Sequence, residues 1–143
     1  MAMVLEGKAL TQFLTQGTRT AKLAVAKRDG APLVSPVWFV MDEDDIVFTT
    51  MNSTLKYQAM RREPMVSVCV ASETFPYGFA SIQGRASLYQ LPHEELLEWT
   101  TKIARRYVPS AQANTFGERN AVEGEILVRV TPLSIFAYAG IAE

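Results

Sequence analysis

The sequence predicts a mainly β protein, an antiparallel barrel of six or seven strands with two or three helices added to it. Short β-rich runs follow one another through residues 20–50, with turn residues but no helical pattern between the first three. Further runs occupy 65–89 and 125–138. A parallel doubly wound sheet would need strands that alternate with helices, and no dinucleotide-binding or phosphate-loop glycine pattern is present.

Length and composition set the bounds of this prediction. The 143 residues, 48% of them hydrophobic and 20% charged, fit one domain, which we expect to span 1–143. A net charge of −1 argues against a nucleic-acid-binding surface. No apolar run reaches the roughly 20 residues that cross a bilayer, and the first residues lack a signal-peptide core. We therefore expect a cytoplasmic protein that binds neither nucleic acid nor membrane.

The first half of the chain contains two of the expected helices. In order, the expected elements are a helix over 8–16, strands over 21–26, 33–41 and 46–50, and a helix over 53–62. In the first helix Leu10, Phe13 and Leu14 share one face, and Gly17 is a stop signal. Within the second strand, Pro36 indicates a sheet edge, a bulge or a break.

The second half contains one long helix between strand pairs. The expected elements are strands over 65–72 and 79–89, a helix over 92–108, a loop with some local helix over 109–120, and strands over 125–131 and 134–138. Glu94 and Glu95 in the first turn of the helix, and Arg105 and Arg106 in its last, complement the helix dipole. Pro132 separates the last two expected strands.

One cysteine and one histidine limit the chemistry of the side chains. A lone Cys69 excludes an intrachain disulfide, and its β-rich surroundings favour a buried apolar role over a nucleophile. His93 stands at a helix start on an exposed face. A Ser-His-Asp triad, a Cys-His pair and a zinc site are disfavoured, so we expect no metal site.

A group of hydroxyl residues and a lysine stands where the second helix should begin. Thr49 and Thr50 end a strand, Ser53 and Thr54 follow, and Lys56 falls in the first helical turn. Free N–H groups and the helix dipole favour an anion there, so a cation at this position suggests an anionic ligand such as a phosphate. The alternative is a surface helix in which Ser53 or Thr54 is an ordinary N-cap.

Two neighbouring aromatic residues give a second candidate feature. Trp38 and Phe39 should point to opposite faces of their strand, one into the core and the other into a groove or interface. Tyr77, in the loop before the strand over 79–89, is another aromatic candidate. Aromatic residues in such positions are more often core residues than cofactor platforms.

The order and spacing of these motifs resemble the pyridoxamine 5'-phosphate oxidase-like split β-barrel superfamily and, more narrowly, its F420-dependent oxidoreductase branch. The matching segments are Thr18–Ala24, Arg28–Gly30, Pro36–Val40, Val47–Thr50, Thr54 with Lys56, Arg61–Pro64, Tyr77–Ala80 and Gly84–Ala86. The resemblance covers nearly the whole chain.

The resemblance implies a homodimer that binds F420, or alternatively FMN, in grooves between its subunits. The cofactor ring would lie along Ser35, Pro36, Val37 and Trp38, while Thr49, Thr50, Thr54 and Lys56 would hold the phosphate. Tyr77 would come from the partner subunit and is a candidate proton donor. Gln58 departs from the pattern, because relatives often carry a second basic residue there. The chain stops at Glu143 without an arginine-bearing extension, which disfavours vitamin B6 oxidation.

The function implied is hydride transfer between F420 and a small organic electrophile, for which the protein needs no nucleophile of its own. Two alternatives remain open on the same fold. One is an FMN-dependent oxidoreductase or FMN-binding protein, and the other is a non-catalytic cofactor or haem binder, or a structural dimerisation module. The sequence does not distinguish F420 from FMN, and it does not name the substrate.

Overall fold

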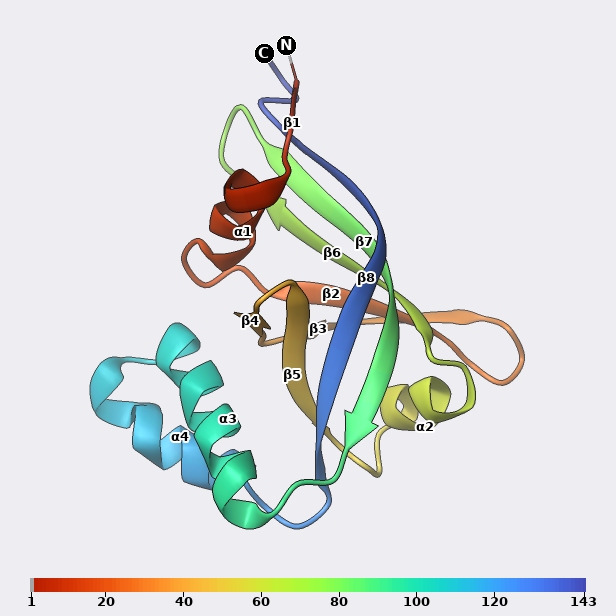
Figure 1. Cartoon of the computed structure of the whole chain (residues 1–143), viewed down its shortest axis with the longest axis vertical. Helices are drawn as coiled ribbons and strands as arrows, with labels where there is room; N and C mark the ends of the chain where they lie inside the picture. Colours follow the sequence, from red (N-terminus) through yellow and green to blue (C-terminus); the bar gives the residue numbers. More distant parts are fainter. Residues whose placement is uncertain (1) are drawn as a thin grey trace.

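Eight strands and four α-helices make up the described part of the chain, residues 2–143, in a computed structural model (Figure 1). The strands are β1 (Met3–Val4), β2 (Ala21–Ala26), β3 (Pro32–Val37), β4 (Val40–Asp42), β5 (Asp45–Met51), β6 (Met65–Ser72), β7 (Gly78–Tyr89) and β8 (Glu125–Ala139). The helices are α1 (Gly7–Thr15), α2 (Leu55–Arg62), α3 (His93–Tyr107) and α4 (Ala113–Asn120). The mainly β, antiparallel prediction is confirmed, but the described residues form eight strands and four α-helices where the sequence predicted six or seven strands and two or three helices.

All eight strands join one sheet in the order β3-β2-β6-β7-β8-β5-β4, with β1 paired to the far end of β8. The two edge strands, β3 and β4, are separated in the chain by Trp38 and Phe39 alone. Three Cα steps span at most about 11 Å, so the sheet must curl until its two edges meet. The result is a barrel in which the edge strands β3 and β4 are joined by the two-residue connection and not by a ladder of backbone hydrogen bonds.

This crossover corrects the prediction of one strand over 33–41. The strand is broken at Trp38–Phe39, and its two parts pair with different partners, β3 with β2 and β4 with β5. Pro36 lies in an edge strand, one of the three positions that its sequence context indicated. An edge strand tolerates proline because one side of its backbone needs no ladder partner.

The C-terminal strand also differs from expectation. The sequence predicted two strands separated at Pro132, whereas β8 runs without a break over 15 residues. A bulge accommodates the proline, since Gly84 lies opposite Pro132 and Gln83 lies opposite Ser134, which leaves Leu133 as the extra residue. Gly84 is needed at this point, because a Cβ there would lie 2.7 Å from the Thr131 carbonyl oxygen.

A main core fills the barrel, and a second core lies under α3. The large, fully buried side chains of the barrel include Leu14, Leu23, Phe39, Phe48, Met60 and Ile82. Leu14 comes from α1 and Met60 from α2, so both helices contribute to the barrel core. The second cluster joins Ile103 of α3 to Val40, Val47 and Leu127 of the sheet. No helix in residues 2–143 is long and apolar enough to cross a membrane.

The segment 109–120, expected to be mainly a loop, is largely helical. A short 3-10 turn over Ser110–Gln112 leads into α4, which packs against α3 (Figure 1). The close contact depends on Gly117, because a Cβ there would lie 2.1 Å from the Thr101 hydroxyl oxygen. The buried Thr100 hydroxyl donates to the Gly117 carbonyl oxygen at 2.8 Å. Such small-residue packing leaves no strong apolar periodicity, which is why the sequence pattern missed it.

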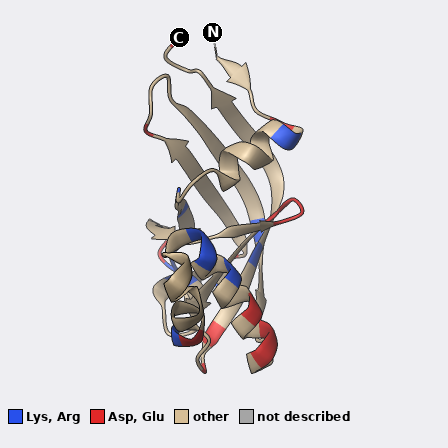
Figure 2. Cartoon of the chain, turned by 90° about the vertical axis from the view of Figure 1, so that its left-hand side faces the viewer, with Lys and Arg blue, Asp and Glu red and all other residues tan. Residues whose placement is uncertain are grey.

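Charges along α3 follow the helix dipole as expected. Glu94 and Glu95 lie in its first turn and Arg105 and Arg106 in its last. In Figure 2 the ribbon of this helix is accordingly red towards one end and blue towards the other. Arg106 does more than complement the dipole, since it connects three segments of the fold at the edge of the candidate site described next.

Candidate functional site

The corner where β5 meets α2 contains the predicted phosphate residues. The Thr54 side chain caps α2 by accepting a hydrogen bond from the Tyr57 amide at 3.2 Å, and it donates to the Met51 carbonyl oxygen at 2.9 Å. The Thr50 hydroxyl, 4% exposed, lies 3.0 Å from the Thr54 hydroxyl. Thr54 is thus the N-cap that the alternative interpretation of the sequence required, and its hydroxyl is engaged within the chain.

Thr49 points to the opposite face of β5, as strand alternation requires. Its hydroxyl donates to the Glu125 carboxylate at 2.8 Å, which joins β5 to the start of β8. Burial raises the pKa of Glu125, while the Thr49 hydrogen bond and the charge of Lys56 act in the opposite direction. The predicted phosphate corner therefore contains a carboxylate beside its lysine. The sequence did not reveal Glu125, because a charged residue at the first position of a strand resembles ordinary surface.

The start of α2 keeps the features that suit an anion. The amides of Leu55 and Lys56, in its first turn, have no acceptor within the helix. The Lys56 side chain is half-buried. Gln58, the position that departs from the family pattern, donates to the Asn52 carbonyl oxygen at 3.0 Å and so holds the β5–α2 loop.

The predicted ring strand lies at the open edge of the sheet. Pro36 is exposed, Ser35 is half-buried and Val37 is buried. Trp38 remains 37% exposed, whereas Phe39 is fully buried. Phe39 thus enters the core, as predicted for one of the two aromatic residues, and Trp38 stays partly exposed, although the strand ends before them.

Trp38 is held by residues of α3. Its ring stacks on Tyr107 with centroids 5.1 Å apart and planes 5° from parallel. The Tyr107 hydroxyl donates to the Arg19 carbonyl oxygen at 2.8 Å and accepts from the Phe39 amide at 3.1 Å. Burial raises the pKa of Tyr107, against the hydrogen bond at Phe39 and the charge of Arg106, which keeps this hydroxyl a donor. The crossover between the two sheet edges is therefore fixed from outside the barrel.

Arg106 makes the second connection to the crossover. Its guanidinium donates to the carbonyl oxygens of Phe39 at 2.9 Å, Leu14 at 2.8 Å and Gly17 at 3.0 Å. The Leu14 and Gly17 carbonyls lie at and just beyond the end of α1, where a helix leaves its last acceptors unpaired. Burial lowers the pKa of Arg106 from a value so high that the group stays charged.

Tyr77 lies in the loop between β6 and β7, after a cis peptide bond between Phe75 and Pro76. It is 44% exposed, and its ring meets Phe75 edge-on at 5.9 Å. Figure 1 shows this loop and α2 at opposite ends of the barrel. Within one protomer, Tyr77 is therefore not brought together with Lys56.

The sheet also has an uncovered outer face. Pro36, Lys22, Cys69, Ser81 and Phe136 form one row across five neighbouring strands, from β3 to β8. Alternation places these side chains on the same face, away from the barrel core. Cys69 is thus half-exposed in this row and not buried as the sequence suggested.

At the β7–β8 end, the outer face is aromatic. Phe79, Phe136 and Tyr138 have ring centroids between 4.9 and 6.2 Å apart. Phe136 is 58% exposed and the nearby Leu133 62%.

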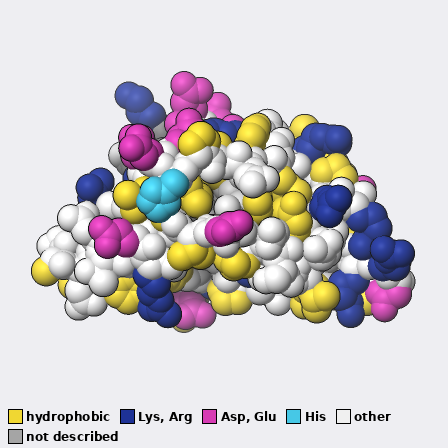
Figure 3. Space-filling view, turned by 90° about the horizontal axis from the view of Figure 1, so that it is seen from below, with side chains coloured by type: hydrophobic (Ala, Val, Ile, Leu, Met, Phe, Trp, Pro, Cys, Tyr) yellow, Lys and Arg dark blue, Asp and Glu magenta, His cyan; other side chains and the backbone are white. Residues whose placement is uncertain are grey.

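The remaining candidates lie apart from these features. His93 begins α3 in an exposed position, and Figure 3 shows the histidine side chain on the surface at that end of the molecule. Among residues 2–143, no three His, Cys, Asp or Glu side chains are arranged to hold a metal ion.

Two comparisons by sequence had different results. The family model described as pyridoxamine 5'-phosphate oxidase matches residues 7–132. Among curated proteins, no sequence matches the chain.

Solved structures with this fold include proteins with different cofactors in their names. An F420 reductase is 21% identical, with a TM-score of 0.67 over 87% of this chain and 94% of its own. An FAD-binding protein from Mesorhizobium loti is 20% identical, with a TM-score of 0.70 over 96% and 97%. HutZ, the haem storage protein of Vibrio cholerae, is 17% identical, with a TM-score of 0.71 over 95% and 96%. At these identities the likeness shows a common fold.

Proposed function

Because the chain belongs to the pyridoxamine 5'-phosphate oxidase family, we propose that it is an oxidoreductase that binds a tricyclic, phosphate-bearing cofactor, F420 in our first choice, and reduces a small organic electrophile. The observation that carries this proposal is the β5–α2 corner. A half-buried lysine and the amides of Leu55 and Lys56, which have no acceptor within the helix, belong to the first turn of α2 there.

The donors at this corner fit a phosphate, whereas the neighbouring carboxyl group of Glu125 opposes one when it is ionised. The Lys56 ammonium and the amides of Leu55 and Lys56 are donors in the first turn of α2, where an anion is stabilised. Glu125 is an acceptor and, when ionised, repels a phosphate beside Lys56. Its raised pKa lessens this repulsion, because burial favours the neutral carboxyl group. The corner therefore suits a phosphate best when Glu125 is protonated or turned away.

The ring would lie along Ser35–Trp38, at the open edge of the barrel. This strand is supported where it ends, since Tyr107 stacks on Trp38 and binds the backbone of Phe39. A reduced deazaflavin, when bound, supplies the hydride. The protein's own contribution is to orient ring and acceptor and to keep water from the reacting face. The proton for the reduced product would come from solvent or from the partner subunit's Tyr77.

We further propose that two copies of the chain pair through the outer face. Phe79, Phe136 and Tyr138 form an aromatic cluster in which Phe136 is 58% exposed. Contiguous exposed apolar patches of this kind mark protein interfaces. Pairing would also bring Tyr77 of one subunit towards the groove of the other, which one protomer does not achieve alone.

FMN is the second candidate cofactor, and one observation favours it. The Gln58 side chain is neutral and donates to the Asn52 carbonyl oxygen, so this position adds no positive charge for a polyanionic tail. A solved protein of the same fold is named as FAD-binding, which supports a flavin on this scaffold. A haem binder is supported less, because His93, the one histidine of the sequence, lies exposed at the start of α3.

An absorbance spectrum of the purified protein, followed by titrations with F420 and with FMN, tests the proposal. We expect saturable binding of F420 with reduction of an activated enone by the reduced cofactor. If the protein binds FMN but not F420, FMN would replace F420 as the proposed cofactor. Binding of neither would exclude both and leave a structural dimerisation module or a haem protein.

A further inference from the structure

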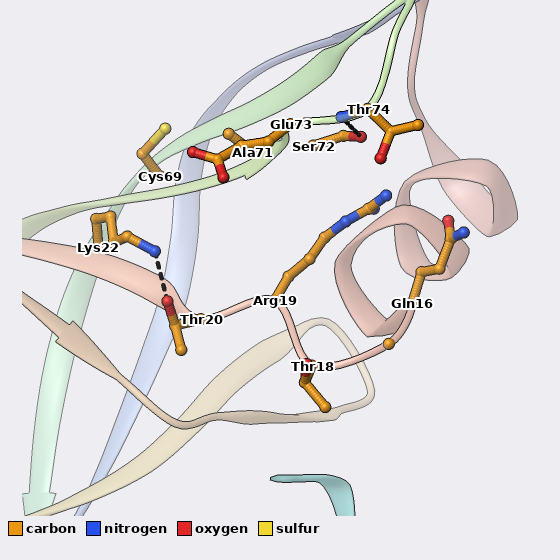
Figure 4. A pocket seen from close by; sticks show the side chains of 11 residues that line it. Gln16, Thr18, Arg19, Thr20, Lys22, Cys69, Ala71, Ser72, Glu73 and Thr74 are labelled. Carbon is orange, nitrogen blue, oxygen red and sulfur yellow. Dashed lines mark hydrogen bonds between the residues drawn. The ribbon is translucent and has the colours of Figure 1, made fainter.

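A cavity of about 500 Å³, lined mostly by residues with polar side chains, lies beside α1, and we call it the Lys22 pocket. Its walls come from three segments: the α1–β2 loop over 16–20, Lys22 with its neighbour Cys69 in the sheet, and residues 71–74 at the end of β6. Figure 4 shows Arg19 reaching across the cavity towards Thr74, and Lys22 at its other end. None of the residues assigned above to ring or phosphate lines this pocket.

Two cations belong to the pocket. The Lys22 ammonium is exposed and is hydrogen-bonded to the Thr20 hydroxyl. One guanidinium nitrogen of Arg19 donates to the Phe13 carbonyl oxygen at 2.8 Å, and the guanidinium carbon lies 4.4 Å from the centre of the Phe13 ring. Within residues 2–143 neither cation forms an ion pair. Glu73 is the one acidic residue of the lining, so two positive charges face one negative charge.

The rest of the lining suits an oxyanion. The hydroxyls of Thr18, Thr20, Ser72 and Thr74 and the amide of Gln16 can each donate a hydrogen bond. Arg19 is anchored through Phe13 and keeps N–H groups for a further acceptor. An anchored guanidinium, an ammonium group and several hydroxyls in one cavity match the donors that carboxylates and phosphates require.

The pocket adjoins the strand proposed for the cofactor ring. Lys22 is the direct cross-strand partner of Pro36, and both point to the outer face. Neighbouring strands are about 4.8 Å apart, so an anion at Lys22 would lie one strand away from the ring strand. Lys56, the proposed phosphate residue, belongs to a different corner of the barrel. The two anion sites are therefore separate.

We propose that the Lys22 pocket binds an oxyanionic group of the electron acceptor, so that the preferred acceptors are acids and not neutral compounds. This inference rests on the proposed function, because it assumes that the cofactor ring lies along Ser35–Trp38. The pocket itself, however, can be tested on the protein without any cofactor.

The first experiment is an NMR titration of cofactor-free protein with benzoate and, separately, with inorganic phosphate. Amide signals of the α1–β2 loop and of 71–74 should shift and saturate. Lys22→Gln should weaken binding by about tenfold or more, as expected for loss of a charge-assisted contact. Lys27→Gln, just beyond the far end of β2, is the matched control and should bind like the wild type. If these amide signals do not shift, or if the Lys22 variant binds benzoate and phosphate as tightly as the wild type, the pocket is not an oxyanion site.

The second experiment compares cinnamate with its methyl ester as acceptors of the reduced cofactor. For the wild type and for Lys22→Gln, kcat/KM is measured with cinnamate and with methyl cinnamate. The ratio of the cinnamate value to the ester value should be about tenfold lower in the variant. An unchanged ratio would overturn the acceptor assignment. So would a loss of cofactor affinity in this variant, since the pocket would then hold an anionic part of the cofactor itself. If the wild type binds neither F420 nor FMN, the proposed function fails, while the NMR titration still decides the pocket.

Discussion

The Thr49 hydroxyl donates a 2.8 Å hydrogen bond to the carboxylate of Glu125, directly beside the lysine of the β5–α2 corner. This contact joins the end of one strand to the start of another. It also places a negative charge where the family resemblance predicts a phosphate. The protonation state of Glu125 should therefore influence both folding stability and anion binding.

Glu125→Gln should be at least as stable as the wild type at neutral pH. Burial raises the pKa of Glu125, so the folded state binds its proton more tightly than the unfolded state does. The wild type should then lose stability as pH rises from the usual carboxyl pKa through the raised value, and the glutamine variant should not. Thermal melts across this range measure the difference, which should vanish at acidic pH. A variant less stable than the wild type at neutral pH would contradict this account.

The same substitution should strengthen phosphate binding. Removal of one negative charge near Lys56 is worth on the order of 1 kcal/mol, or about fivefold in the dissociation constant of FMN or F420 at neutral pH. Glu123→Gln, which changes an exposed residue just before β8, is the matched control. Equal affinity in the Glu125 variant and the wild type would mean that the phosphate does not lie at this corner.

Lys56→Ala should weaken cofactor binding with little loss of fold stability. Loss of a charge-assisted contact costs about 1.5–3 kcal/mol, which corresponds to roughly ten- to hundredfold in affinity. Titration by fluorescence or absorbance measures the affinity, and a thermal melt checks the fold. Lys8→Ala, an exposed change on α1, should leave both unchanged. Wild-type affinity in the Lys56 variant would remove this residue from the site.

Arg106→Met should destabilise the fold by about 2–4 kcal/mol, because three carbonyl oxygens lose their donor while the apolar stem of the side chain is kept. Its neighbour Arg105 is exposed, so Arg105→Met is a close control on the same helix. Urea unfolding of both variants measures the effect. Similar urea midpoints for Arg106→Met and Arg105→Met would show that the contacts of Arg106 with α1 and the crossover contribute little to the free energy of unfolding.

Gly117→Ala should separate α4 from α3. The new Cβ would lie 2.1 Å from the Thr101 hydroxyl oxygen and 2.9 Å from the Thr101 Cα, so a rotamer change alone cannot relieve the clash. We expect a loss of about 1–3 kcal/mol in a thermal or urea melt. Glu118→Ala, on the exposed side of α4, should fall within about 0.5 kcal/mol of the wild type. A stable Gly117 variant would mean that the two helices can move apart without cost.

Phe136→Ser should shift the proposed dimer towards monomer. The side chain is 58% exposed in one protomer, so its loss should harm the fold of that protomer little. Analytical ultracentrifugation of wild type and variant measures the association state. Val122→Ser, an exposed apolar change away from the outer face, is the control. A wild type that sediments as a monomer at all concentrations would contradict the dimer directly.

Local patterns predicted most of the fold and missed what depends on distant neighbours. The strands over 21–26 and 65–72 agree with prediction at both ends, since alternation and turn residues determine them locally. The break at Trp38 could not be predicted in this way. It follows from the pairing of the two halves with different strands, and from Tyr107 and Arg106, which are far away in sequence.

For the candidate site, residue types were easier to predict than their surroundings. The hydroxyls and the lysine of the β5–α2 corner are visible in the sequence because they are adjacent in it. Glu125 is not, since it joins the corner only through the pairing of β5 with β8. Lys22 and Pro36 likewise become neighbours only through the register of β2 and β3.

The pairing of β8 has a consequence for how the chain is made. It joins β7 to β5 and carries β1, and it follows every other described element in chain order. Before the ribosome has released it, the β4–β5 hairpin has no ladder to the rest of the sheet. Until β8 has been made, the nascent chain can hold only two separate half-sheets, whose open edges are able to pair with other chains.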